Sequence, residues 1–141
     1  PAVIRPATPA DRGPLTRLQS RLPEPSPDLL DAALDDAAPT PAALVSTADG
    51  EGGTPVAFLL AVAGDGTTYV AELVVAPARR REGRARALLA ACAERTDDAL
   101  TVTVAPDNEA ARALYRDCGF EKRERLPDFF DGGAAIRYRR D

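Results

Sequence analysis

Residues 74–89 of this chain read VVAPARRREGRARALL, and this stretch decides how the chain folds. Val74 and Val75 end an apolar strand, and a run of arginines and Gly83 leads directly into a helix rich in alanine and leucine. The first turn of a helix has N–H groups without intrahelical partners, and the helix dipole adds positive potential there. Gly83 lets an anion approach the backbone, and arginines supply charge-assisted hydrogen bonds. The stretch therefore predicts a binding site for a ligand that carries a pyrophosphate.

The length and composition are those of an ordinary soluble globular protein. A chain of 141 residues, 45% hydrophobic and 28% charged, predicts a single domain over 1–141 that buries a real core. No apolar run approaches the length of a membrane span, and residues 1–5 lack the layout of a signal peptide. We therefore expect a cytoplasmic protein with no membrane partner.

The charge pattern favours a small anionic ligand over nucleic acid. The net charge is −4, and nearly all the positive charge is arginine, since Lys122 is the only lysine. The arginines cluster at 79–86 and in the C-terminal strands. An extended nucleic-acid surface favours a basic domain, so we expect no nucleic-acid partner.

The absence of histidine narrows the possible chemistry. It excludes the usual zinc clusters and Ser-His-Asp or Cys-His catalysis, and we expect no metal. Cys92 and Cys118 each lie on the apolar stripe of a predicted helix. Both are predicted to be buried free thiols in a reducing compartment.

The order of the predicted elements indicates an α/β (α+β) fold. Strands are expected at 2–5, 42–47, 54–63, 68–75, 99–104, 120–125 and 134–139, and helices at 8–21, 26–36, 84–95 and 108–118. Glycine-rich turns at 49–53 and 64–66 predict antiparallel hairpins, and 126–133 is expected to be a loop. This order predicts a central mixed, mostly antiparallel sheet of about seven strands flanked by four helices. Neither a Rossmann glycine fingerprint nor a P-loop is present.

Two motifs resemble those of the GNAT superfamily of N-acetyltransferases. The run Arg80-Arg81-Glu82-Gly83-Arg84-Ala85 is similar to that family's acetyl-CoA signature, (Gln/Arg)-x-x-Gly-x-(Gly/Ala). A second block, Asn-x-x-Ala-x-x-x-Tyr-x-x-x-Gly-Phe, is matched by Asn108, Ala111, Tyr115, Gly119 and Phe120. The two motifs stand in the family's order and at a fitting separation.

The resemblance implies acetyl-CoA as co-substrate and a role for each matching position. Backbone groups of Leu73, Val74 and Val75 would pair with the pantetheine arm. The turn and helix start would hold the pyrophosphate through Arg80, Arg81, Glu82, Gly83, Arg84, Ala85 and Arg86. Asn108 would contact the coenzyme, and Tyr115 would lie near the thioester sulfur. A phenol has a reference pKa of about 10 and a thiol about 8.5, so Tyr115 is a plausible acid for the departing thiolate.

Each of these positions also has a purely structural interpretation. Tyr115 lies on one helical stripe with Ala111 and Cys118, and periodicity alone makes it a core residue. Asn108 is first a helix N-cap, a role compatible with coenzyme contact. The arginines of 79–86, taken singly, are typical of a solvated helix face.

Glu72 stands in an otherwise apolar strand, where a carboxylate is costly without partners or water. A general base, or an anchor for the substrate ammonium group, would explain it. A local ion pair or a β-bulge that exposes the side chain would explain it equally well.

The closing segment, 126–136, reads LPDFFDGGAAI and is similar to the last hairpin of the ribosomal-protein alanine N-acetyltransferase subfamily. The resemblance implies that Phe129 and Phe130 bind the acceptor, in place of the tyrosines usual there. That subfamily carries a glutamate base where this chain has Thr103. Thr103 cannot act as a base at neutral pH, so either Glu72 or an ordered water must do so if the subfamily assignment is right.

The expected function is acetyl transfer from acetyl-CoA to a primary amine by direct transfer, in a monomer or homodimer. A protein N-terminus is the favoured acceptor, and a small amine or amino acid is the alternative. A non-catalytic acyl-CoA-binding module and a purely structural partner-binding domain are the rival interpretations.

Overall fold

The structure is a computed structural model that describes residues 3–23, 25–35, 42–48, 53–130 and 133–141. Within these ranges the strands are β1 (Val3–Pro6), β2 (Ala42–Thr47), β3 (Pro55–Ala63), β4 (Thr67–Val75), β5 (Ala99–Val104), β6 (Glu121–Phe130) and β7 (Gly133–Arg140). The helices are α1 (Arg12–Gln19), α2 (Pro27–Asp35), α3 (Arg84–Glu94) and α4 (Glu109–Asp117), with 3-10 turns η1 (Pro9–Asp11) and η2 (Pro77–Arg79). None of these helices combines the length and the apolar character that a transmembrane segment needs.

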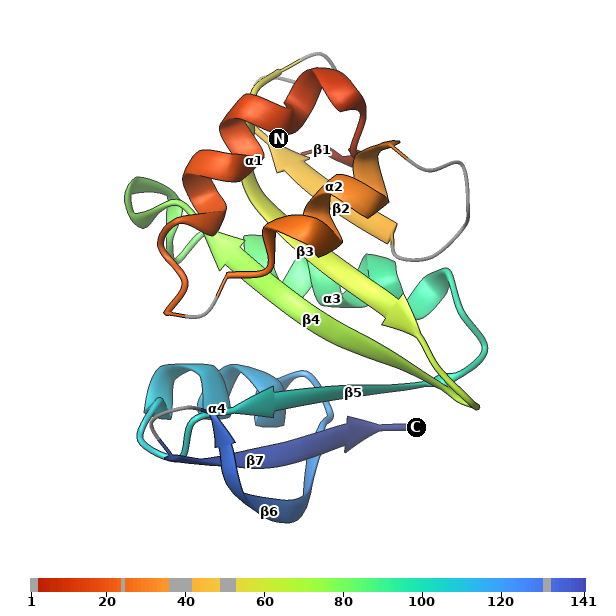
Figure 1. Cartoon of the computed structure of the whole chain (residues 1–141), viewed down its shortest axis with the longest axis vertical. Helices are drawn as coiled ribbons and strands as arrows, with labels where there is room; N and C mark the ends of the chain where they lie inside the picture. The colour runs from red at the N-terminus through yellow and green to blue at the C-terminus, as the bar shows by residue number, and fades with distance from the viewer. Residues whose placement is uncertain (1–2, 24, 36–41, 49–52, 131–132) are drawn as a thin grey trace.

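All seven strands form one sheet in the order β1-β2-β3-β4-β5-β7-β6 (Figure 1). Strands β1 to β4 pair antiparallel in sequence order; a short turn joins β3 to β4, whereas η1, α1 and α2 lie between β1 and β2. Gly66 has φ +73° in that turn, a conformation that favours glycine. The β4–β5 pair alone is parallel, and α3 provides the crossover between them. The predicted mixed, mostly antiparallel sheet with four helices is confirmed.

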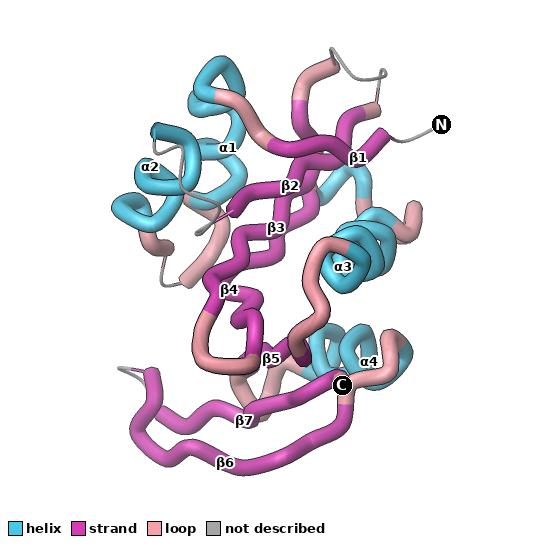
Figure 2. Tube along the Cα trace, turned by 90° about the vertical axis from the view of Figure 1, so that its right-hand side faces the viewer, coloured by secondary structure: helices cyan, strands magenta, loops and turns pink. Residues whose placement is uncertain are grey.

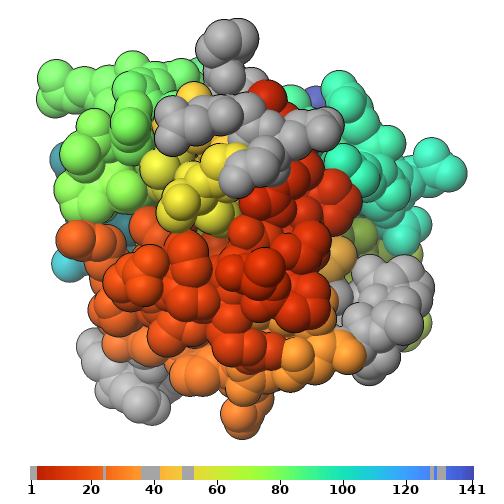
Figure 3. All heavy atoms as spheres, turned by 90° about the horizontal axis from the view of Figure 1, so that it is seen from above, coloured from red at the N-terminus to blue at the C-terminus, as the bar shows by residue number. Residues whose placement is uncertain are grey.

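The helices cover the sheet from both sides (Figure 2). Leucines of α1 and α2, among them Leu15 and Leu30, pack on Val45 and Phe58. On the other face, Leu88 and Leu89 of α3 pack with residues of α4 and β7 in a second core. Seen from above, the red and orange spheres of the N-terminal segment that includes α1 and α2 form a continuous surface (Figure 3). The sheet therefore separates two apolar cores.

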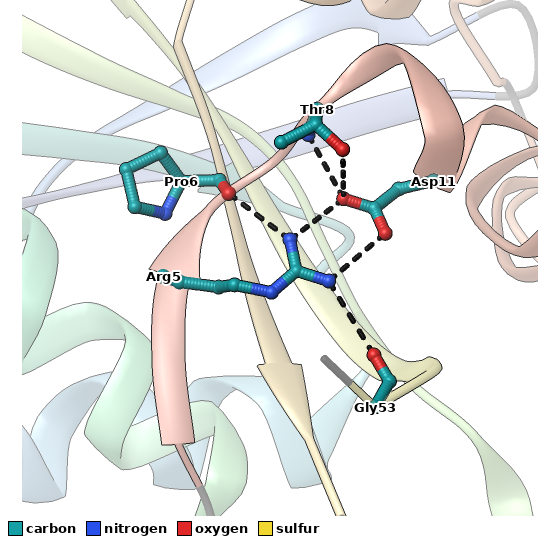
Figure 4. Close-up of polar contacts among 5 residues, drawn as sticks. All are labelled: Arg5, Pro6, Thr8, Asp11 and Gly53. Carbon is teal, nitrogen blue, oxygen red and sulfur yellow. Dashed lines mark hydrogen bonds and ion pairs between the residues drawn. The ribbon is translucent and has the colours of Figure 1, made fainter. Parts of the chain in front are cut away.

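A buried ion pair fixes the entry into α1. Asp11, 5% exposed, accepts hydrogen bonds from both terminal nitrogens of Arg5, at 2.7 and 3.0 Å (Figure 4). It also accepts from the backbone N–H of Thr8 at 2.8 Å, so the carboxylate caps η1. The Arg5 hydrogen bonds hold the pKa of Asp11 below its ordinary value. Because the partners lie on β1 and η1, this pair ties the first strand to the first helix.

Two predicted boundaries were wrong. The helix expected at 8–21 is divided into η1 and α1, since Pro14 can stand only in the first turn of a helix. The loop expected at 126–133 is strand as far as Phe130, paired with Gly133 across the hairpin. β6 tolerates Pro127 because it is an edge strand with a register shift between Leu126 and Phe130. Residues 131–132 lie outside the described part of the chain.

The cysteine prediction is confirmed for one residue and needs a correction for the other. Cys92 of α3 is buried, and both thiols are free. Cys118 is half-buried and forms the C-cap of α4, one residue before Gly119 with φ +90°. Its side chain packs at the margin of the core rather than within it.

Candidate active site

The site begins where β4 and β5 part. Their parallel pairing covers only Thr67 to Tyr69 on β4, opposite Ala99 to Thr101 on β5. Beyond Tyr69, β4 pairs with β3 alone, so in this register its other edge presents backbone N–H and C=O groups without a strand partner. A ligand with amide groups can pair with such an edge as an added strand would. Leu73, Val74 and Val75, predicted to hold pantetheine, lie on this part of β4.

A β-bulge at Ala71 reverses the faces of β4. Leu60 of β3 pairs with Glu72, whereas the next residue, Ala61, pairs with Val70, so Ala71 is extra. Val70 therefore packs in the core beneath α3 and α4, but Val74 packs in the core beneath α1 and α2. The bulge turns Glu72 to the α1 side and so explains how a carboxylate fits this strand.

A cleft of about 850 Å³ fills the space between the separated strands. Its walls come from β4, β5 and the start of α4, and Glu72, Leu73, Asn108 and Tyr115 all line it. Leu22 and Pro23, which follow α1, line it too, together with Arg125, Gly133 and Ala134 of the last hairpin. The helices α1 and α4 lie on opposite faces of the sheet (Figure 2). Because residues beside both helices line the cleft, we infer that it reaches both faces of the sheet.

Tyr115 projects from α4 into the core and reaches the cleft. The side chain is 6% exposed, and its ring packs edge-on against Phe120 at 5.5 Å and at a tilt against Tyr138 at 6.3 Å. Tyr115 is therefore a core residue that also lines the cleft, and its place near the thioester sulfur stays a prediction. Burial raises the pKa of Tyr115 well above its ordinary value, and the neighbouring Tyr69 adds to this. The phenol stays protonated at neutral pH and can donate a hydrogen bond into the cleft.

Glu72 is 5% exposed, and both of its carboxylate oxygens accept hydrogen bonds. Gln19 Nε2 donates to Oε1 and the backbone N–H of Ser26 donates to Oε2, each at 2.8 Å. Gln19 Nε2 also donates to the Ser26 carbonyl at 3.0 Å. Burial raises the pKa of Glu72, and the two hydrogen bonds partly oppose this. Neutral donors thus hold this carboxylate, and no ion pair of Glu72 is found among the described residues.

Tyr69 and Thr103 form a hydroxyl pair that sequence reasoning missed. The Tyr69 hydroxyl and Thr103 Oγ1 lie 2.7 Å apart, across the point where β4 and β5 separate, and both residues line the cleft. Thr103 occupies the position at which the subfamily resemblance places a glutamate. A tyrosine at an alternating position of an exposed strand face gives no signal of its own, since the pairing depends on strand register.

The predicted phosphate turn has the expected backbone at its centre. Gly83 has φ +77° and is the N-cap of α3, and Arg81 also has a positive φ of 66°. A Cβ built on Gly83 would meet no atom within 4 Å, so the space beside this backbone is open. The N–H groups of Arg84, Ala85 and Arg86 belong to the unpartnered first turn of α3. This turn lies outside the lining of the cleft, and β4 leads to it through η2.

The arginines of this turn divide into two groups. Arg84 is buried: Nε pairs with Glu82 at 2.8 Å, and Nη1 donates to Ser46 Oγ at 2.8 Å. Its guanidinium group therefore ties α3 to β2, and only its backbone faces the turn. Arg80 and Arg81 are exposed, and exposed Arg86 lies 3.6 Å from Asp117. The exposed side chains are those that can reach a phosphate from solvent.

Asn108 has the predicted N-cap role. Its Oδ1 accepts the backbone N–H of Ala111 at 3.2 Å, which satisfies one free donor of α4. The residue is exposed and lines the cleft, and the cap uses its Oδ1 oxygen rather than its amide NH₂ group.

Phe129, near the end of β6, lies outside the cleft lining. Phe129 is 45% exposed and is the most exposed large hydrophobic side chain described. The side chain of Phe130 lies outside what the structure describes. Their predicted contact with the acceptor stays a prediction.

The site thus combines a free strand edge that lines a cleft with a helix start that carries exposed arginines. The acetyltransferase (GNAT) family model matches residues 13–120. The chain therefore belongs to the GNAT acetyltransferase family. It is an acetyl-CoA-dependent N-acetyltransferase, with acetyl-CoA as its co-substrate.

Solved structures share the fold at low sequence identity. Arabidopsis thaliana NAA60 in complex with acetyl-CoA superimposes with a TM-score of 0.85 at 18% identity, covering 99% of this chain and 98% of that one. The ribosomal-protein-S18-alanine N-acetyltransferase of Escherichia coli gives 0.83 at 21% identity, with coverages of 99% and 93%. The IAA acetyltransferase of Bacillus cereus gives 0.80 at 17%, with 99% of each chain covered. No curated protein matches this chain significantly by sequence.

Proposed function

We propose that this enzyme acetylates the N-terminal α-amine of a peptide or protein by direct transfer from acetyl-CoA. The observation that carries the proposal is the cleft itself, which reaches both faces of the sheet and ends among exposed residues such as Pro23 and Arg125. An open mouth of this kind accommodates an acceptor that continues as a chain. Two of the similar structures agree with a protein or peptide acceptor: one is named a ribosomal-protein-S18-alanine N-acetyltransferase, and another is a NatC complex bound to Gag peptide and CoA.

Each group of residues in the site has its own role in cofactor binding or acetyl transfer. The backbone of Leu73, Val74 and Val75 pairs with pantetheine, and the N–H groups near Val74 and Val75 stabilise the oxyanion. The amine nitrogen bonds to the thioester carbon, the carbon–sulfur bond breaks, and Tyr115 donates a hydrogen bond or proton to the sulfur. The exposed arginines and the N–H groups from Arg80 to Arg86 hold the pyrophosphate, with Asn108 beside the coenzyme.

Glu72 serves as the base that receives the proton of the amine. A carboxylate has about four lone-pair sites, and two of those on Glu72 are used by Gln19 and Ser26. The remaining sites and the raised pKa suit a proton acceptor inside the cleft. The Tyr69–Thr103 pair replaces the missing glutamate of β5 and orients the acceptor amine.

Release of free CoA thiol over a panel of acceptors tests the function. We expect peptides with free N-termini to be acetylated with kcat/KM at least tenfold above that of free amino acids and small amines, since they fill more of the open cleft. Peptides blocked at the N-terminus are the matched controls. Higher rates with small amines would move the assignment to that class of acceptor. Thermal stabilisation by CoA without any thiol release would instead identify a non-catalytic binding module.

The Gln19→Leu variant tests Glu72 as the base. The Gln19 hydrogen bond lowers the pKa of Glu72, so its loss should raise that pKa further. Because the base must be ionised, the ratio of variant to parent kcat/KM should fall as the pH decreases and recover at high pH. Titration of the acceptor amine is common to both enzymes and cancels in this ratio. A ratio independent of pH would mean that another group takes the proton.

A further inference from the structure

A second groove, of about 690 Å³, lies on the open face of the C-terminal strands. Along β7, Ile136 and Tyr138 are buried in the core beneath α4, so the alternate residues Arg137 and Arg139 face the opposite side. These two arginines line the groove together with Arg123 of β6. No helix contributes to its lining among the residues that the structure describes.

The arginines of the groove are held by exposed ion pairs, which are weak. Arg123, Arg137 and Arg139 line the groove with the carboxylates of Glu124 and Asp141, and Glu121 lies 3.6 Å from Arg123. Arg137 pairs with Glu124 at 2.6 Å, and Asp141 pairs with Arg139 at 2.6 Å and with Arg123 at 3.2 Å. The partners of these pairs are all 40% exposed or more, and exposed ion pairs contribute little to stability. An incoming carboxylate can therefore replace them at small cost.

The groove begins where the cleft ends. Tyr69 lines both, and its hydroxyl meets Thr103 inside the cleft. On β5 and β7, Thr103 pairs with Arg137 and Thr101 with Arg139, so the arginines follow directly along the sheet from the hydroxyl pair. A chain whose amine lies at Tyr69 and Thr103 would place its following residues over these arginines.

We propose that this arginine groove binds acidic side chains of the acceptor, downstream of the amine that is acetylated. The inference rests on the proposed function and adds a substrate class to it: peptides with aspartate or glutamate after the first residue. Asp141 occupies the groove as a carboxylate between Arg123 and Arg139, and shows that their spacing suits such a group. An acidic acceptor competes with Asp141 for these arginines.

The test compares two peptides that share an N-terminal alanine and carry either aspartates or asparagines at the following four positions. Two or three exposed charge contacts of ordinary strength give about a tenfold higher kcat/KM for the aspartate peptide. The preference should shrink as the ionic strength rises from about 0.01 M to about 1 M, because the Debye length falls from about 30 Å to about 3 Å. Equal kcat/KM for the two peptides in the parent enzyme would overturn the proposal.

Variants that should lower or raise the aspartate-to-asparagine ratio of kcat/KM test whether the groove causes the preference. The Arg137→Gln, Arg139→Gln double variant should reduce the aspartate-to-asparagine ratio to about one, and Asp141→Asn should raise it about threefold by removing the competing carboxylate. Arg116→Gln, which removes an exposed arginine of α4, is the control and should keep the parent ratio. A preference that survives in the double variant, or falls in Asp141→Asn, would contradict the assignment. The Asp141 variant decides the matter if the double variant does not fold.

A measurement of peptide binding distinguishes failure of this inference from failure of the proposed function. If neither peptide is acetylated, the proposed function fails, and calorimetric titration of both peptides in the presence of CoA still tests the groove. Tighter binding of the aspartate peptide, lost in the double variant, would support the groove without the reaction. Equal binding of both peptides would overturn it.

Discussion

Replacement of Gly83 by aspartate should weaken acetyl-CoA binding about 100-fold in Kd. We take a separation of about 4–5 Å between a carboxylate on this turn and the bound pyrophosphate. At an effective dielectric constant near 20, repulsion at that distance costs about 3–4 kcal/mol, and about 1.4 kcal/mol corresponds to tenfold in affinity. Space is not the obstacle, since a Cβ at Gly83 meets nothing within 4 Å in the structure. Calorimetric titration with acetyl-CoA measures the effect.

Two matched variants separate charge from backbone strain. Gly66 has φ +73°, close to the +77° of Gly83, and its Cβ position is equally open, but it lies in the β3–β4 hairpin. Gly66→Asp should therefore lose as much thermal stability as Gly83→Asp and keep the parent Kd. Gly83→Asn has nearly the same shape without the charge and should bind acetyl-CoA more tightly than Gly83→Asp. Equal affinities in the parent enzyme and Gly83→Asp would remove the turn from the cofactor site.

The features that sequence could predict are local ones. The turn at Gly83 follows from a strand, a glycine and a helix start within a few residues, and the Asn108 cap from a single residue before a helix. The sequence could not show which arginines of this turn are buried and which are exposed. Arg84 is turned inward by hydrogen bonds to Ser46 and Thr47, which lie 38 and 37 residues earlier. In the sequence alone, an arginine beside a glycine turn suggests a ligand contact. The structure shows that the partners of Arg84 are instead buried groups of β2.

Glu72 is a stronger example of a site residue whose surroundings could not be predicted from the sequence. Its polarity within an apolar strand was visible, but its donors lie on Gln19 and at Ser26, 53 and 46 residues away. The bulge at Ala71, which determines the face to which Glu72 turns, depends on pairing with β3. Alternation of apolar residues cannot reveal an extra residue when both faces of a strand are covered. The Tyr69–Thr103 pair likewise arises from the register of two strands 34 residues apart.

Replacement of Tyr115 by phenylalanine should lower kcat about 100-fold and change the Kd for acetyl-CoA less than about threefold. Burial keeps this phenol protonated, so it can donate a hydrogen bond to the departing thiolate, and removal of one such donor costs about 10²- to 10³-fold in kcat. The ring contacts with Phe120 and Tyr138 remain in the variant, so the core and the coenzyme groove keep their packing. Single-turnover acetyl transfer at saturating acetyl-CoA measures the chemical step apart from binding.

Tyr138→Phe is the matched control, because it removes a hydroxyl from a buried tyrosine of the same core. That hydroxyl accepts a hydrogen bond from Arg112 Nε at 3.1 Å, and Tyr138 does not line the cleft. Loss of the bond should cost about 1 kcal/mol of stability with kcat preserved. The two variants thus separate a hydroxyl that supports the fold from one that acts on the thioester. If Tyr115→Phe kept the parent kcat, the departing sulfur would have to obtain its proton from another group, and Tyr115 would be a core residue alone.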